Sequence, residues 1–563
     1  MAQRMHRAAA HVRRAVYNVS VPADAARAAE IARTPFDVII AGAGPAGLAM
    51  AHELSQRKIR SVLLERGRFL ETDKVFALPY PIVERYGLAA AVQMRHRDTY
   101  FRNYFGLNAP THIDYCLMDQ RKVLSLLASR IDDAYCTVVE NCELTAFARD
   151  GLVIGKTVVN DYRTLRYSVA RKSFPRSTSR LNVDDAFFQK HDPLVTVNAM
   201  DELDNIEKER DNMAFRARMI VDAGGYHSNL VRSFHRQRSC TVLKCLMYEF
   251  SGLKRPQPEI IWDLAMPTVT SANFWVDVFG PKSAGAGVMV FTETTPGDPA
   301  GEPPSEEMER YLSSWLNIRK LSGNFERERK GIIPMTDFRE ASAYDNILFI
   351  GASATRQIPD TGFGFAPSLE EASLAAPVIE KALAAGDTSV RMLREYDIAW
   401  LRSCEKKMAL NKFFQGFHYA IRRDEYFHEF AKRCTELPSE IIQRRIANDL
   451  TGGDLRTIAA MFVKNPYLLH PSRFESARMP ELKRDLARFL YCLVSQALGF
   501  YVPEGSEMFD REPLSGSMLK RMLLSMRIYF GRRIPETILC KIGSLLFKPC
   551  VQAVIGIIGG QKR

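Results

Sequence analysis

A glycine-rich turn between two short apolar runs is the feature that most constrains the fold of this chain. It lies in residues 36–65, which read FDVIIAGAGPAGLAMAHELSQRKIRSVLLE. The apolar run before the turn predicts a buried strand, and the small residues after it predict a helix. Gly42 permits a tight turn, Gly44 gives a pyrophosphate access to backbone amides, and Gly47 lets helix and strand pack closely. The segment predicts a βαβ unit that binds a dinucleotide, with an ordinary ligand-free turn as the alternative.

The helix and the second strand of this unit supply polar groups for the same ligand. The helix that starts near Ala46 offers free N–H groups and a partial positive charge to phosphates. The second strand, residues 61–64, ends on Glu65, whose carboxylate can accept hydrogen bonds from both hydroxyls of an adenosine ribose. Arg66 follows directly, and we include it in the predicted cofactor site.

A second glycine turn follows a buried strand later in the chain. Residues 219–221 are apolar and run into Asp222-Ala223-Gly224-Gly225. Glycine allows the backbone to turn sharply beside a ligand. Asp222 and Gly224 are therefore predicted to lie at the cofactor, and a plain turn is the alternative.

A third strand, residues 346–350, ends on Gly351 and leads through a turn into a long helix, residues 368–384. This arrangement places backbone amides at a helix start, where they can hold the negative N1–C2=O edge of a flavin. The predicted FAD site is completed by residues of this turn, namely Gly351, Pro359, Thr361, Gly362 and Phe363.

Composition limits the partners of the chain. With 563 residues, 46% of them hydrophobic, it can bury a large core in two or more domains. The net charge of +12 suits an anionic membrane surface or nucleic acid, but the sequence has no zinc finger or RNA-recognition signature. We expect a membrane surface and no nucleic acid. The ten cysteines form no C-x-x-C pair and the eleven histidines no H-x-x-x-H pair, which predicts reduced thiols, no secretion and no metal site.

The patterns together predict an α/β fold with a Rossmann-like FAD-binding domain around a parallel sheet. We expect that domain to be discontinuous, with an insertion at 151–215, and to consist of residues 35–80, 115–235 and 340–390. Residues 241–295 alternate in β-rich runs, which is typical of an antiparallel sheet. We assign residues 81–114 and 236–339 to an inserted, mostly antiparallel substrate domain. Candidate side chains for an apolar pocket, with core packing as the alternative, are Trp262, Phe274, Trp275 and Phe291.

Three further segments lie outside this core. Residues 1–34 form a basic arm, either an organelle transit peptide or a disordered arm. The insertion at 151–215 is either solvated or a membrane- or partner-binding loop. Residues 391–563 read as helical, and two basic amphipathic pieces, 518–534 and 538–558, favour attachment to a membrane surface over a helical cap. We expect a peripheral membrane protein, on the cytoplasmic side or in a plastid-like organelle.

The three glycine strand ends, in the order GAGPAG, DAGG and GASA…PDTGFG, resemble the flavoprotein superfamily of aromatic hydroxylases, geranylgeranyl reductases and lycopene cyclases. Within it the chain is most similar to the lycopene cyclases. Residues 350–363 resemble that family's G-x-x-A-x-x-x-H-P-x-T-G-Y element, 291–295 resemble F-L-E-E-T, and 333–335 read I-P-M. The resemblance covers roughly residues 37–414.

Several residues depart from the family pattern. Ile358 replaces the cyclase His, Phe363 the Tyr, and Thr294 the second Glu of F-L-E-E-T. Gln120 stands about where an Arg is expected. Hydroxylases usually carry G-D in the third element, and this chain has Gly351-Ala352 instead. The departures leave the predicted flavin site intact and open the question of substrate and product.

The resemblance implies an FAD-dependent cyclase of a long isoprenoid or carotenoid, with reduced flavin and no net redox change. In such a reaction an acid protonates a terminal alkene, an internal double bond attacks the cation, and a proton leaves. Glu293 is the candidate acid, because a strand-end carboxyl in an apolar pocket stays protonated. A solvated surface acid is the alternative at this position.

Two other functions remain open at the level of sequence. The same scaffold serves FAD-dependent monooxygenases, halogenases and isoprenoid reductases, which consume NAD(P)H or another electron source. A non-catalytic flavin- or membrane-binding module is the third reading. A product of unchanged mass would distinguish cyclisation from both.

Overall fold

The computed structural model describes residues 35–465, with breaks at 98, 103–107, 148–151, 158–211, 229, 232–239, 254–259, 264–271, 281, 295–305, 320, 322, 335–341, 359–361, 401–402, 405 and 421–424. Outside that range it describes 16–18, 27, 467 and 482. The predictions for 518–534 and 538–558, and for most of the insertion at 151–215, lie outside the described residues.

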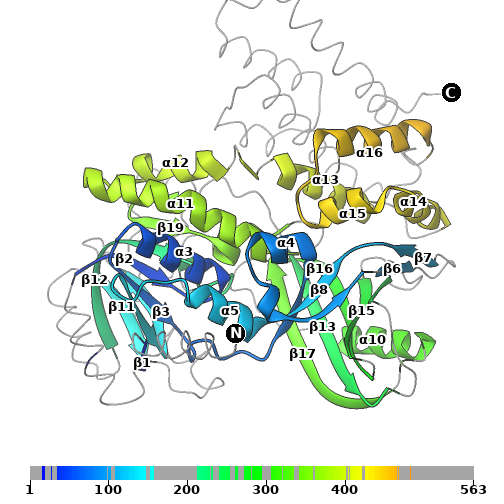
Figure 1. Cartoon of the computed structure of the whole chain (residues 1–563), viewed down its shortest axis with the longest axis horizontal. Coiled ribbons are helices and arrows are strands. Elements are labelled where there is room, and N and C mark those ends of the chain that lie inside the picture. The colour runs from blue at the N-terminus through cyan, green and yellow to red at the C-terminus, as the bar shows by residue number, and fades with distance from the viewer. Residues whose placement is uncertain are drawn as a thin grey trace, which may run out of the picture.

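A nine-stranded sheet carries the first glycine-rich turn (Figure 1). Its strand order is β1-β9-β3-β2-β12-β11-β10, and β19 pairs with β12 and β18. The strands are β1 (Val16–Asn18), β2 (Phe36–Ala41), β3 (Ser61–Glu65), β9 (Cys136–Glu140), β10 (Cys142–Phe147), β11 (Leu152–Thr157), β12 (Asn212–Asp222), β18 (Ala343–Tyr344) and β19 (Ile347–Phe349). The pairs among β1, β9, β3, β2, β12 and β19 are parallel, which confirms the predicted α/β class.

Alternate residues of β2 enter two separate cores, as expected for a strand buried on both faces. Val38 and Ile40 pack in the core that contains the helices, whereas Ile39 packs in the core on the opposite face. The helices that cover the first face are α3 (Pro45–Gln56), α5 (Gln120–Ala128) and α11 (Phe365–Ala385). Small residues in α3 let α11 approach it closely, and this helix pair lies directly behind the glycine turns.

A seven-stranded sheet, in the order β17-β13-β16-β15-β14-β6-β7, forms the second half of the described structure (Figure 1). It contains β6 (Thr99–Arg102), β7 (Asn108–Thr111), β13 (Cys240–Ser251), β14 (Ile260–Asp263), β15 (Ala272–Gly280), β16 (Ser283–Thr294) and β17 (Asn324–Pro334). Its central pairs are antiparallel, as predicted, and helix α10 (Glu306–Arg319) covers one face.

A three-stranded sheet links the two larger sheets. It comprises β4 (Val75–Pro79), β5 (Val92–His96) and β8 (Tyr115–Asp119), in the order β4-β8-β5. The short helices α4 (Tyr80–Arg85) and η1 (Ala89–Ala91) follow β4 and precede β5. Since β8 runs directly into α5, this sheet brings the seven-stranded sheet to the helical face of the nine-stranded sheet.

Helices dominate the described chain after the third glycine turn. The turn itself contains the short helix η4 (Gly351–Ala354). After it come α11, α12 (Val390–Trp400), α13 (Lys406–Ala420), α14 (Glu425–Thr435), α15 (Ser439–Ile446) and α16 (Gly452–Lys464). The expected helical C-terminal region is present as far as the structure describes it. No helix among the described residues is both long enough and apolar enough to cross a membrane.

One expectation about local structure was wrong. Residues 16–18, assigned to an arm, form strand β1 and pair in parallel with β9. Residues 136–147 form the successive strands β9 and β10, which join different neighbours: β9 pairs with β3, and β10 pairs with β11. The division into domains with the boundaries given above stays a prediction.

Candidate functional site

The three glycine turns meet because their strands are neighbours in one parallel sheet. Asp222 at the end of β12 lies in register with Ala41 of β2 and with Phe349 of β19. Parallel strands end at the same edge of a sheet, where open α/β folds bind ligands. The turns that the sequence separates by more than three hundred residues therefore lie at one edge.

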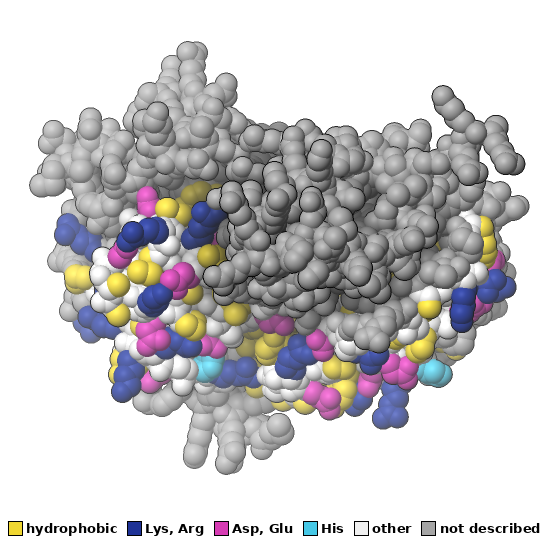
Figure 2. All heavy atoms as spheres, turned by 90° about the horizontal axis from the view of Figure 1, so that it is seen from above, with side chains coloured by type: hydrophobic (Ala, Val, Ile, Leu, Met, Phe, Trp, Pro, Cys, Tyr) yellow, Lys and Arg dark blue, Asp and Glu magenta, His cyan; other side chains and the backbone are white. Residues whose placement is uncertain are grey.

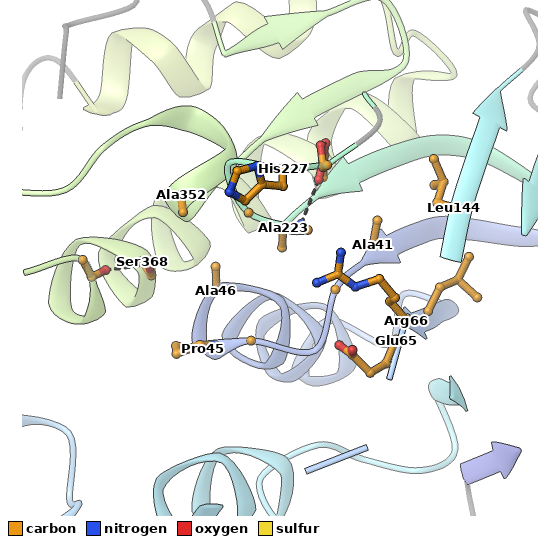
Figure 3. A pocket seen from close by; sticks show the side chains of 18 of the residues that line it. Ala41, Pro45, Ala46, Glu65, Arg66, Leu144, Ala223, His227, Ala352 and Ser368 are labelled. Atoms are coloured by element: carbon orange, nitrogen blue, oxygen red, sulfur yellow. Dashed lines mark hydrogen bonds between the residues drawn. The ribbon is translucent and has the colours of Figure 1, made fainter. Parts of the chain in front are cut away.

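A cavity of about 570 Å³ opens at this edge. Figure 3 shows Ala46 at the start of α3, Glu65 and Arg66 at the end of β3, and Ala223, His227 and Ala352 around the same space. The predicted site residues that line it are Gly42, Gly44, Ala46, Glu65, Arg66, Asp222 and Gly224. Four other predicted residues belong to the same turns but do not line the cavity, namely Gly47, Gly351, Gly362 and Phe363.

The glycines of the first turn differ in what surrounds them. Gly42 has φ +94°, and a Cβ there would lie 2.7 Å from the carbonyl oxygen of Ala223. A Cβ on Gly47 would collide with the carbonyl oxygen of Gly42. Around Gly44, by contrast, no atom would lie within 4 Å of an added Cβ. Gly42 and Gly47 thus serve close packing within the fold, while Gly44 faces the open cavity.

Backbone donors at the turn are arranged around the Glu65 carboxylate. Its two oxygens accept hydrogen bonds from the N–H groups of Ala43 and Gly67, both at 2.8 Å. These contacts hold the acid at the cavity wall and leave further lone pairs for a ligand. Arg66 extends along the same wall, 3.9 Å from the Glu143 carboxylate. Helix α3 has neither a side-chain cap nor an acid in its first turn, so its N-terminal amides face the cavity uncompensated.

Asp222 connects the second glycine turn to the third. Its carboxylate accepts hydrogen bonds from Gly224 N–H at 2.8 Å, from the Ser228 hydroxyl, and from Ser353 Oγ at 3.1 Å. The Ser353 hydroxyl also accepts from Gly225 N–H at 2.8 Å. Burial raises the pKa of Asp222 to about 6, although these hydrogen bonds favour the ionised form. The residue fixes both turns as well as lining the cavity.

A buried ion cluster, formed by Arg356, Glu371 and Asp397, stabilises the third turn. Gly351 has φ +64° and donates its N–H to the Glu371 carboxylate of α11. The Arg356 guanidinium lies 3.6 Å from Glu371 and donates to Asp397 at 2.8 Å and to the Tyr396 hydroxyl at 2.7 Å. Desolvation raises the pKa of Glu371 to about 8, against the opposing effect of Arg356. The predicted residues Pro359 and Thr361 lie outside the described part of the chain.

The structure separates the residues predicted to line a substrate pocket. Phe274 is buried in the core under α10, where its ring stacks on Trp315 with centroids 5.1 Å apart. The expectation that it faces a substrate is corrected, because alternation along β15 directs it away from Trp275. The ring of Trp275 lies against Gly287, where a Cβ would collide with it. For Trp262, Phe291 and Glu293 the structure describes the backbone alone, with Glu293 in register with Thr241.

Two residues with notable surroundings in the structure, Lys74 and Asp277, were not predicted from the sequence. Lys74 lines the cavity beside Gln120, whose N–H donates to the Lys74 carbonyl at 3.1 Å. Asp277 lies in the middle of the apolar strand β15, and burial raises the pKa of its carboxyl to about 7. An acid within the run ANFWVDVF was a readable signal for Asp277, whereas nothing near Lys74 in sequence marks it. Among the described residues, no group of three or more His, Cys, Asp or Glu side chains could hold a metal ion.

Comparison with known proteins finds a family match over part of the chain and a shared fold. Residues 288–470 match the family model described as lycopene cyclase protein. The digeranylgeranylglycerophospholipid reductase 1 of Methanococcoides burtonii is 22% identical over 215 residues, which is 38% of this chain and 51% of that protein. A second such reductase, from Methanothrix thermoacetophila, is 25% identical over 140 residues, or 25% of this chain and 33% of its own length. The match thus spans about half the length, or less, of these curated relatives.

Among solved structures, a geranylgeranyl bacteriochlorophyll reductase-like protein from Thermoplasma acidophilum superposes with a TM-score of 0.51 and 14% identity. The superposition covers 77% of this chain and 99% of that protein, which supports a shared fold. Sequence motifs, family match and fold agree with one another. The chain is therefore similar to the lycopene cyclases over residues 288–470 and to the digeranylgeranylglycerophospholipid reductases over 215 residues, and it shares the fold of the solved reductase-like protein.

Proposed function

We propose that the protein is an FAD-dependent enzyme that forms a ring on a long apolar isoprenoid, in the manner of a lycopene cyclase. The observation that carries this proposal is the cavity at the edge of the parallel sheet, lined by three glycine turns. The family match over residues 288–470 supports the reaction type. It includes the strand end with Glu293 and the turn from Gly351 to Phe363.

The residues of the cavity fit FAD. Gly44 leaves open space beside the first amides of α3, which suits a pyrophosphate, and Glu65 suits a ribose. The start of α11 has Gly364 as its N-cap and no acid in its first turn, and Gly364, Phe365 and Ser368 line the cavity. Amides at this helix start would receive the negative edge of the flavin. When bound and reduced, FAD would supply negative charge close to a substrate cation.

Side chains of the protein would donate the proton and surround the substrate. Glu293 is the proposed acid, which gives its proton to a terminal alkene of the substrate. Trp275, whose ring lies over Gly287, is proposed to line the apolar pocket further along the substrate, because Gly287 lies six residues from Glu293 on β16. Trp262 and Phe291 are proposed for the same aromatic surface, and Phe274 is not, since it packs in the core. The apolar surroundings would exclude water, which could otherwise add to the cation.

Replacement of Glu293 tests its role. Glu293→Gln keeps the size of the side chain and removes the transferable proton, so cyclisation should fall by at least about a hundredfold. FAD affinity should stay within about twofold, because the change lies outside the glycine turns. Pigment analysis and FAD titration of the purified variant measure the two effects. Turnover at the wild-type rate would remove Glu293 from the mechanism.

A reductase of isoprenoid double bonds is the second candidate function. The curated relatives are digeranylgeranylglycerophospholipid reductases, and this observation favours reduction over the other redox reactions of the superfamily. A reductase would consume NAD(P)H or an equivalent electron source and give a product heavier by two hydrogens for each bond reduced. Cyclisation gives a product of unchanged mass.

Contact with a membrane surface is a further part of the proposal, because a long isoprenoid is held in lipid. The net charge of +12 supports it. On the described surface seen from above, Lys and Arg alternate with Asp and Glu (Figure 2), so the described part offers no single basic face in that view. Flotation of the full chain with anionic and with neutral vesicles tests the contact. Binding to neither kind would contradict it.

Expression in a lycopene-accumulating host tests the function directly. We expect a ringed isomer of lycopene in cells that produce the wild-type chain and only lycopene in cells that produce Gly44→Val. A product of higher mass would select the reductase or monooxygenase instead. Unchanged lycopene, with FAD-loaded protein present in the cells, would contradict the cyclase proposal.

A further inference from the structure

Two strands of the seven-stranded sheet, β13 and β17, contact the surroundings of the cofactor cavity at two places. They are antiparallel neighbours, with Leu243 in register with Ile333. A Cβ on Gly362 of the third glycine turn would lie 3.1 Å from Leu243 and 3.4 Å from Ile333. Two residues after Gly362, Gly364 lines the cavity. Four residues before Ile333, Arg329 of β17 reaches a second part of the cavity wall.

That second part is the short segment that enters β4. Its Lys74 lines the cavity together with Val75 and Phe76 of β4. The Phe76 ring lies 5.7 Å from the ring of Phe365, the first residue of α11, so the segment lies beside a helix start that also lines the cavity. Gln120 N–H donates to the Lys74 carbonyl at 3.1 Å. The backbone of the segment is therefore held on the α5 side by Gln120.

Arg329 holds the same segment from the seven-stranded sheet. Its guanidinium donates to the backbone carbonyl of Asp73 at 2.8 Å and to the Asp73 carboxylate at 3.1 Å. Its Nε donates to the Glu249 carboxylate of β13. The hydrogen bond from Arg329 lowers the pKa of Asp73, which keeps that carboxylate ionised at neutral pH. Arg329 thus ties the residue directly before Lys74 to both strands that meet the third glycine turn.

Burial and backbone contact distinguish Arg329 from its neighbour Arg327. The Arg329 side chain is 18% exposed, and Glu249 is 9% exposed. Arg327 pairs with the same two carboxylates, but its side chain is 45% exposed. Its hydrogen bond to Asp73 goes to the carboxylate, whereas Arg329 also binds the main chain. A largely buried guanidinium on a carbonyl restricts the backbone, while an exposed ion pair contributes little.

We propose that Arg329 is a positioning residue that holds Lys74 at the cavity wall through the backbone of Asp73. The inference rests on the proposed function, because the charge of Lys74 matters only if the cavity binds an anion such as FAD. Without Arg329 the segment keeps its contact with Gln120 but loses its attachment to β17. The Lys74 side chain then samples more positions, and its charge acts less strongly on the ligand.

The test is a double-mutant cycle on FAD affinity. The purified wild type is compared with Arg329→Met, Lys74→Met and the double variant by fluorescence titration with FAD at two salt concentrations. Arg327→Met is the matched control. Glu249 keeps one arginine partner in either arginine variant, so no buried carboxylate loses all its positive charge and both variants should fold. Circular dichroism of each protein checks the fold.

Lys74→Met and Arg329→Met should each bind FAD roughly three- to tenfold more weakly than the wild type. The double variant should be no weaker than Lys74→Met, because Arg329 acts through Lys74. Added salt should reduce both single losses alike, since it screens the same charge. A purely structural loss would not depend on whether residue 74 is charged. Arg327→Met should stay within about twofold of the wild type.

Three results would overturn the role of Arg329 while leaving the proposed function in place. The first is a loss in the double variant equal to the product of the single losses, which would mean that Arg329 acts on the fold in general. The second is wild-type affinity in Arg329→Met or in Lys74→Met. The third is an equal loss in Arg327→Met, which would assign the effect to the whole ion network.

The outcomes for the proposed function are distinct from these. A wild type that binds no FAD at all would overturn the proposed function and the role of Arg329 together. A wild type that binds FAD and forms no ring on lycopene would contradict the cyclase proposal alone, because the cycle measures binding and not turnover.

Discussion

At the scale of single residues, the cavity contains, besides the predicted Arg66, a second positive charge that the sequence pattern does not mark. Arg66 and Lys74 both line it, and Arg66 lies 3.9 Å from Glu143. Gln120 also lines it, at about the position where the resemblance leads one to expect an Arg. Lys74 lies in the segment that enters β4, with its carbonyl bound by Gln120 N–H. It can therefore supply the charge that Gln120 lacks.

Replacement of Lys74 by Met should weaken FAD binding by roughly three- to tenfold, because an exposed charge contributes on the order of 1 kcal/mol to a phosphate contact. The loss should shrink as salt is added, since ions screen the interaction. Fluorescence titration of FAD at two salt concentrations measures both effects. Lys122→Met, an exposed lysine two residues beyond Gln120, is the control. Equal affinity of Lys74→Met and the control would contradict the assignment.

The glycines of the first turn were predictable because their requirement is local. Gly42 and Gly47 are constrained by backbone atoms of the βαβ unit and its neighbouring strand. Lys74 owes its place at the cavity to the pairing of β4 with β8, which is distant in sequence, so local pattern could not assign it a role. Phe274 was assigned to the wrong face of its strand, because the run of aromatics in β15 does not itself indicate which face packs against α10.

At the scale of elements, an ion cluster joins the third glycine turn to two helices. Arg356 after η4 contacts Glu371 of α11 and Asp397 of α12, and all three side chains are buried. The guanidinium also lies over the rings of Tyr396 and Trp400. Asp397 accepts hydrogen bonds from the N–H groups of Ser342 and Ala343, just before β19. The cluster therefore holds the turn, both helices and the end strand together.

Arg356→Met should destabilise the protein by about 3–5 kcal/mol, because it leaves two buried carboxyls without their positive partner. Denaturant unfolding monitored by circular dichroism measures the loss. Arg391→Met is the control, since Arg391 is an exposed residue of α12 whose ion pair with Asp387 lies at the surface. A loss under about 1 kcal/mol in Arg356→Met would mean that the cluster contributes little to stability.

The pH dependence of stability should reveal Glu371. Its folded pKa is raised from 4.5 to about 8, so the native state binds a proton that the unfolded state releases. This contribution is full below about pH 4.5 and is lost as the pH rises toward 8. Glu371→Gln removes the titrating group, so its stability relative to the wild type should increase between pH 5 and 8. Thermal unfolding across this range checks the trend, and a constant difference would contradict it.

At the scale of the whole molecule, one short turn connects the cavity proposed for FAD to the seven-stranded sheet. The nine-stranded sheet brings three glycine turns to one edge, and segment 362–364 leads from there to the seven-stranded sheet. The fold class was predictable, because each strand and glycine turn is marked locally. The link through Phe363 and Tyr115 was not, because it depends on how β8 and the third turn pack together.

The central claim is that these glycine turns bind one FAD molecule, and titration of the purified chain with FAD tests it most directly. A Cβ at Gly44 meets no protein atom within 4 Å, so Gly44→Val should fold normally and lose FAD through collision with the pyrophosphate. Gly331 of β17 has equally open surroundings away from the cavity, which makes Gly331→Val the matched control. We predict a yellow wild type and control, and a colourless, folded Gly44→Val. A wild type that stays colourless with excess FAD, or a Gly44→Val that binds it equally well, would contradict the account.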